Sequence, residues 1–110
     1  MEAAIQKAKE ALETHEEIYV LYWGATMRLA DFFILVPVEN SEKKFAVKLS
    51  GIEYGEWEDQ QKVPTAKTIL NEIHEVRVDG DEIRIRFGWG KKWQNLHKWD
   101  GKPVRIDTLD

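Results

Sequence analysis

The stretch from Glu82 to Trp99 holds the side chains best suited to bind a ligand. It begins with strand-like alternation, in which Ile83, Ile85 and Phe87 share one side, and it continues into a segment rich in Trp and Lys. Single-stranded nucleic acids are bound by aromatic rings that stack on bases and by cations that neutralise phosphates. The side chains that could bind a single strand in this way are Arg84, Arg86, Lys91, Lys92, Trp89, Trp93 and Trp99.

A protein-binding or core role explains the same tryptophans more simply. Large aromatic residues are more often buried in a core than exposed, and the net charge of -4 disfavours a dedicated nucleic-acid binder. Exposed Trp is also enriched at the energetic centres of protein interfaces. The first hypothesis is therefore a non-catalytic interaction module, a small adaptor or inhibitor that binds another protein. Its partner-binding residues are predicted to be Trp57, Trp89, Trp93, Lys91 and Lys92.

An acidic segment surrounds Trp57. Glu53, Glu56, Glu58 and Asp59 flank Trp57 and the neighbouring Tyr54. A loop of this composition suits docking on a basic protein surface, because complementary charge steers association. The alternative is a solvated loop with Trp57 inserted into the core.

Signals for catalysis are weak. Asp31, Glu42 and Lys44 loosely match the Asp and Glu-x-Lys spacing of a metal-dependent nuclease, in which carboxylates hold the metal and Lys assists the attacking water. Glu42 and Lys44 fall in a polar turn, however, and so lack rigid support. His15 and His74 each precede a glutamate, but only a speculative repeat would bring them together. We predict no enzyme activity, no cofactor and no metal site.

Length and composition indicate one globular domain over residues 1–110. The chain is 43% hydrophobic, and no apolar run approaches the roughly 18 residues that a membrane span needs. Its first residues are amphipathic, unlike a secretory signal, and it has no cysteine, so a cytoplasmic location is expected. Charge is polarised: residues 84–110 hold seven Lys or Arg and three Asp or Glu, whereas residues 1–83 hold nine against seventeen.

The apolar pattern predicts an α+β fold. It has two helices on one face of a mostly antiparallel sheet of five or six strands, in the order α-β-β-β-α-β-β-β. The first helix is expected over Glu2–Thr14, and the second begins at Pro64 with an apolar stripe of Ala66, Ile69, Leu70 and Ile73. Similar motifs at the two predicted helix ends suggest a weak αβββ repeat over 1–58 and 59–110.

Two predicted strands have no polar side. Residues 18–23 and 32–38 are apolar on both faces, which is typical of central strands that are covered on both sides. Two short helices would cover one face. The other face is expected to be covered by the tryptophan segment, by residues 50–62 or by a second molecule, so a homodimer is a further expectation.

Overall fold

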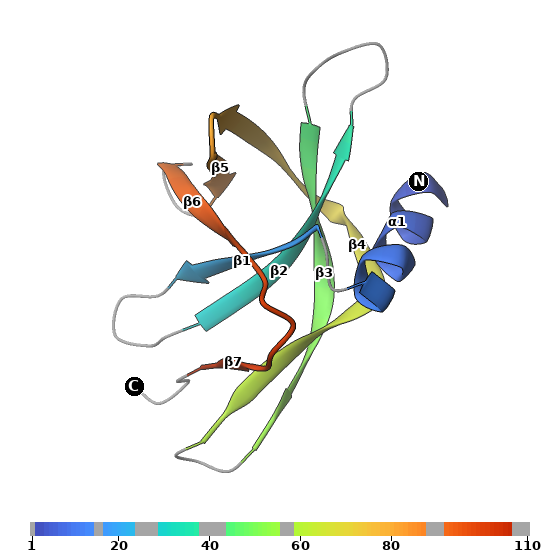
Figure 1. The fold of residues 1–110 in the computed structure, drawn as a ribbon, viewed down its shortest axis with the longest axis vertical. Coiled ribbons are helices and arrows are strands. Elements are labelled where there is room, and N and C mark those ends of the chain that lie inside the picture. The colour runs from blue at the N-terminus through green and yellow to red at the C-terminus, as the bar shows by residue number, and fades with distance from the viewer. Residues whose placement is uncertain are drawn as a thin grey trace.

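The residues that the structure describes form one short helix followed by seven strands (Figure 1). The structure, a computed structural model, describes residues 2–14, 17–23, 29–37, 44–55, 59–87 and 92–106, without the side chains of 2–4, 70–72 and 87. The elements are α1 (Glu2–Thr14), β1 (Ile18–Trp23), β2 (Leu29–Pro37), β3 (Lys44–Tyr54), β4 (Gln61–Asp79), β5 (Glu82–Phe87), β6 (Lys92–Lys98) and β7 (Val104–Arg105).

Strands β1 to β6 form a closed antiparallel barrel. Each strand pairs with the next one in sequence, and β6 returns to β1 through Tyr19↔Lys98 and Val20↔His97. Closure removes the free edges that an open sheet leaves exposed. The short β7 lies outside this ring, where it pairs with the first residues of β4.

The predicted α+β arrangement of two helices on a sheet is wrong. The helix predicted at Glu2–Thr14 is present, but the segment from Pro64 onward belongs to β4, and the sheet closes on itself. The order is therefore one helix and seven strands. Residues 59–110 contain a strand where a second αβββ unit would have a helix.

Bulges interrupt β4 in the region where the sequence resembles a helix. Val47 pairs with Ile73 and the next residue, Lys48, pairs with Ile69, so residues 70–72 are an insertion in the ladder. Ile69 and Ile73 therefore face neighbouring positions of β3 although they are four residues apart, which is also the spacing of a helical stripe. Extra residues of this kind bend a strand sharply and increase its twist.

The first of two hydrophobic cores fills the barrel. Its buried members are Leu21, Phe33, Leu35, Ala46, Ile85 and Leu96. Tyr19, Val76 and Ile83 pack against them from partly buried positions. Burial raises the pKa of the Tyr19 phenol above its ordinary value of 10.0, and the negative charge of Glu17 raises it further, so this phenol stays neutral at physiological pH.

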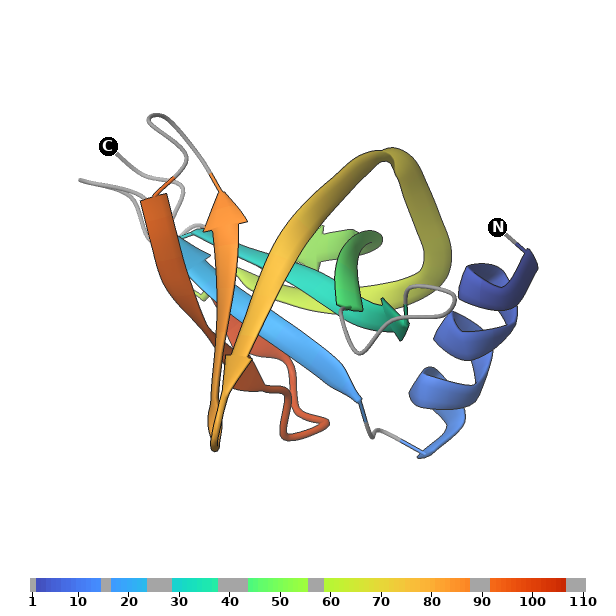
Figure 2. The ribbon, with the colours of Figure 1, turned by 90° about the horizontal axis from the view of Figure 1, so that it is seen from above.

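The second core lies on the outer wall of the barrel. Alternate residues of β1, β2 and β3 point outward and are covered by Ala8 and Ala11 of α1 and by Trp99, Val104 and Ile106 near the C-terminal end. Figure 2 shows α1 beside the bend of β4 and on the opposite side of the molecule from β5 and β6. Ile18–Leu21 of β1 and Ala30–Leu35 of β2 are thus covered on both faces within one chain, whereas Tyr22 and Trp23 at the end of β1 are each 40% exposed.

No helix in the described part of the chain is long and apolar enough to cross a membrane.

Replacing Phe33 by Ala tests the inner core. Phe33 is fully buried, so the substitution should lower the free energy of unfolding by about 3–5 kcal/mol. Phe45 on the next strand is 41% exposed, and Phe45→Ala should cost less than about 1 kcal/mol. Urea denaturation of both variants measures the difference. Equal losses would contradict the assignment of Phe33 to the barrel interior.

Candidate partner-binding site

Ile52, the most exposed of the large hydrophobic residues that the structure describes, lies on a β-ribbon that extends beyond the barrel. We call this ribbon the arm; it consists of Gly51–Tyr54 of β3 and residues 61–64 of β4. The two segments pair from Gly51↔Pro64 to Tyr54↔Gln61, and β7 adds to residues 61 and 62. In Figure 1 the arm continues past the end of the β2–β3 pairing, at the lower end of the picture.

One face of the arm is apolar and open to solvent. Ile52 is 56% exposed and Tyr54 is 44% exposed, and both lie on the same face because they are two residues apart in a strand. Val63 is the direct cross-strand partner of Ile52 and extends this face. The Tyr54 hydroxyl donates a hydrogen bond to Gln61 Oε1 at 3.2 Å, which fixes the ring beside its neighbours.

The stretch of sequence that joins the two segments of the arm is acidic, whereas Lys62 lies within the arm and the exposed Arg105 of β7 pairs with Gln61. Residues 51–60 include four carboxylates and no Lys or Arg. Among them, Glu53 and Asp59 are exposed. An apolar face beside carboxylates suits a partner surface that combines apolar and basic groups.

Lys62 anchors the arm to the barrel. Its Nζ donates to the carbonyl oxygen of Ala30 at 2.7 Å and lies 3.2 Å from Asp31 Oδ1. The side chain runs over Gly51, where an added Cβ would be only 2.5 Å from Lys62 Cε. Glycine at this position therefore permits the lysine to reach β2.

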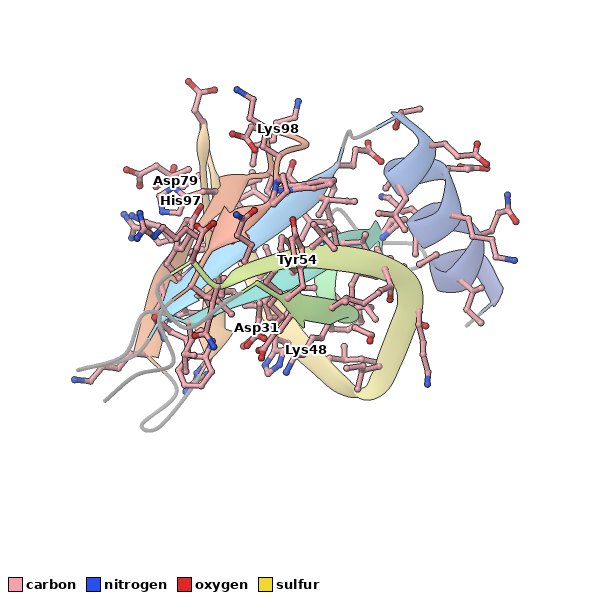
Figure 3. The ribbon with its side chains drawn as sticks, turned by 90° about the horizontal axis from the view of Figure 1, so that it is seen from below. Asp31, Lys48, Tyr54, Asp79, His97 and Lys98 are labelled. Carbon is pink, nitrogen blue, oxygen red and sulfur yellow. The ribbon has the colours of Figure 1, made fainter. Side chains whose placement is uncertain are left out.

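Asp31 is the centre of a charge cluster at the end of the barrel. It is only 4% exposed, and it is the one buried charged residue among those described. Lys48 Nζ lies 3.6 Å from Oδ1, and Trp23 Nε1 donates to Oδ2 at 2.9 Å. Figure 3 shows the side chains of Asp31 and Lys48 close together. Two cations and an indole N–H thus offset the cost of burying the carboxylate.

The predicted nuclease residues are not all described. Lys44 pairs with Pro37, six residues along β2 from Asp31, which corresponds to about 20 Å of strand. Glu42 lies outside the described residues, so this site stays a prediction. No group of three or more His, Asp or Glu side chains within the described ranges is placed to hold a metal ion.

Several residues of the predicted tryptophan site also lie outside the described ranges, namely Trp57, Trp89 and Lys91. Lys92 is exposed at the start of β6, and Trp93 is half-buried beside it. The Arg77 guanidinium lies over the Trp93 ring, 4.8 Å from its centroid. This contact is a cation–π interaction within the protein.

Arg84 and Arg86 share the outer face of the barrel with Trp93. The strand register puts Arg84 opposite Arg77 and Asn95, and it puts Arg86 opposite Trp93. Glu82 accepts a 2.7 Å hydrogen bond from Arg84, and Glu75 lies 3.7 Å from Arg86. Because Asp79 lies opposite Glu82, this face of β4 and β5 balances three arginines with three carboxylates.

Trp99 is part of the outer core. It is 7% exposed, packs edge-on against Phe32, and donates its indole N–H to the Lys102 carbonyl at 2.7 Å. Its ring is therefore not presented to a ligand at the surface.

Sequence reasoning proposed the segment around Tyr54 as an acidic docking loop, which stays a prediction, and it missed the anchor of the arm. Asp31 was considered only as a metal ligand. A single carboxylate at the start of a run of apolar residues is itself a signal, because a buried carboxylate needs cationic partners. Nothing in the sequence, however, indicates that those partners are Lys48 and Lys62, which lie 17 and 31 residues further along the chain.

Comparison with protein-family models, curated proteins and solved structures found no match for this chain. The assignment of the candidate site is therefore argued from the geometry and charge of its residues alone.

Asp31→Ala tests the charge cluster. It leaves the ammonium groups of Lys48 and Lys62 mostly buried without their carboxylate, so the free energy of unfolding should fall by about 3–5 kcal/mol. Asp79→Ala removes an exposed carboxylate and should change the free energy of unfolding by less than about 0.5 kcal/mol.

A triple replacement separates the charge effect from simple loss of packing. Changing Asp31 to Leu together with Lys48 and Lys62 to Met removes all three charges, and it should recover much of the stability lost in Asp31→Ala. Chemical denaturation of the four proteins provides the comparison. If the triple variant were no more stable than Asp31→Ala, the unpaired charges would not be the cause of the lost stability.

Proposed function

We propose that the protein is a non-catalytic interaction module that binds a basic surface of a partner protein through the arm. The observation that carries the proposal is the exposure of Ile52 and Tyr54 on one face of a ribbon that also exposes the carboxylates of Glu53 and Asp59. Aromatic side chains make large contacts at low entropic cost, and acidic neighbours would steer a basic partner toward them.

The same charges favour a different protein over a second copy. Two arms brought together would oppose carboxylates with carboxylates, and like charges across a desolvated interface are unfavourable. A partner with Lys or Arg around an apolar patch has no such penalty. We further propose a cytoplasmic location, since a chain without cysteine does not depend on an oxidising compartment.

Ile52→Lys tests the arm against a matched control. Ile52 and Val78 have similar exposed fractions, 56% and 52%, but Val78 lies at the other end of β4. A partner captured from the source organism and then purified should bind Ile52→Lys at least about tenfold more weakly, as for a central interface residue. It should bind Val78→Lys as tightly as the unaltered protein. Isothermal titration calorimetry gives the affinities.

Two results would contradict the proposal. One is an equal loss of affinity in the two variants; the other is a captured partner whose contact surface is acidic. Affinity for a genuine basic partner should also decrease as salt rises, because salt screens charges at the exposed rim.

Binding of single-stranded nucleic acid is the second candidate function. It is favoured by the shared face of Trp93, Arg84 and Arg86 and disfavoured by the carboxylates that pair with both arginines. Nucleic-acid binding requires net positive potential to displace counterions, which a balanced face does not provide.

Tryptophan fluorescence discriminates the two functions. A mixed-sequence single strand should leave the emission unchanged at low salt if the arm proposal is correct. Quenching that weakens steeply with salt and is lost in Trp93→Phe and Arg86→Ala would instead establish the nucleic-acid function. The charge-conserving Arg86→Lys serves as the control, because it keeps the cation that neutralises a phosphate.

A further inference from the structure

The arm leaves the barrel at a defined point on β2. Pairing between β2 and β3 runs from Pro37↔Lys44 to Phe32↔Leu49, and β3 then continues for five more residues. Where β3 separates from β2, the Ala30 carbonyl accepts a hydrogen bond from Lys62 Nζ. A side chain from β4 thus satisfies a β2 carbonyl next to the point where β3 departs, so the separation is stabilised by a specific contact.

Residues 51–54 of β3 form an edge with an open side. Each of them pairs with β4, and in the part of the chain that the structure describes no strand pairs with them on the other side. In a strand, alternate residues direct their N–H and C=O groups toward each side. An edge of this kind can accept an added strand through backbone hydrogen bonds.

Glu53 lies in the middle of this edge with its carboxylate available. Its direct cross-strand neighbour is Lys62, but the Lys62 ammonium is engaged with Asp31 and the Ala30 carbonyl. Among the described residues no Lys or Arg forms an ion pair with Glu53. Glu53 is exposed, and Ile52 and Tyr54 on either side of it point to the opposite face of the ribbon.

We propose that the β3 edge of the arm binds an extended segment of the partner by strand addition, and that this segment alternates apolar and basic residues. A Lys or Arg of the added strand would face Glu53, and apolar residues beside it would face Ile52 and Tyr54, since directly opposed side chains on a sheet interact. A second copy of this chain is a poor occupant in the register symmetric about Glu53, because that register would place Glu53 against Glu53. This inference rests on the proposed function and specifies its mode of recognition.

Capped model peptides test the strand addition on the whole protein. The probe is the alternating peptide Val-Lys-Val-Lys-Val, and its counterpart carries a methyl group on every backbone nitrogen. Both have the same charge and side chains, but the methylated peptide has no backbone N–H donors. Binding is followed by the amide resonances of the isotope-labelled protein and by the exchange of those amides with solvent.

The unmethylated peptide should shift the amides of residues 51–54 and slow their exchange. The affinity of the methylated peptide should be lower by about tenfold or more, because its backbone hydrogen bonds to the protein are lost. Glu53→Gln should lower the affinity for the unmethylated peptide. Asp81→Asn in the β4–β5 turn changes the net charge by the same amount and should leave that affinity unchanged. The peptide Val-Glu-Val-Glu-Val should not bind.

Each other outcome overturns the inference in a distinguishable way. Equal binding of the methylated and unmethylated peptides, with loss in Glu53→Gln, would reject strand addition and leave charge-driven docking on the arm intact. Absence of binding, or shifts confined to other strands, would reject the β3 edge, while the Ile52→Lys and Val78→Lys comparison separately decides the proposed function. A dimer formed through residues 51–54, detected by sedimentation, would identify a second copy as the occupant.

Discussion

The pairing of β3 with β4 is the constraint on which the rest of the structure depends. It closes the barrel and also continues outward as the arm, so one ladder serves both the interior core and the exposed ribbon. A regular ladder of that length could not do both, because regular strands continue along one gently twisted surface. The two register shifts in β4 supply the bend, and the hydrogen bond from the Thr65 hydroxyl to the Ser50 carbonyl satisfies the backbone at the second of them.

The Asp31 cluster links the two parts that this ladder joins. Asp31 belongs to β2 in the barrel wall, Lys48 belongs to β3, and Lys62 belongs to the arm. Since removing one member leaves the others buried and poorly paired, the cluster strongly favours a single arrangement of the three strands. These contacts restrain the arm relative to the barrel, and a restrained ribbon loses less entropy on binding than a mobile loop would.

The sequence predicted those elements whose side-chain pattern is local. The helix at Glu2–Thr14 and the tight turn after Asp79, where Gly80 adopts a φ of 64°, could be read from short stretches. The second helix could not be rejected, because the insertion between Ile69 and Ile73 imitates helical spacing. Ion pairs such as Arg86 with Glu75, and the burial of Trp99 against Phe32 on the outer wall of the barrel, depend on strand register and on which face is covered. Neither property is encoded in any one segment.

The up-and-down connectivity has a consequence for how the chain folds. Because every pairing within the six-strand barrel except that between β1 and β6 joins strands that are consecutive in sequence, most of the barrel can form from hairpins whose loops are cheap to close. The β1–β6 seam brings together residues 19 and 98, and it consists of two paired positions. We therefore expect this seam to form after the other hairpins and to be the first to open, with backbone amides that exchange faster than those of β2.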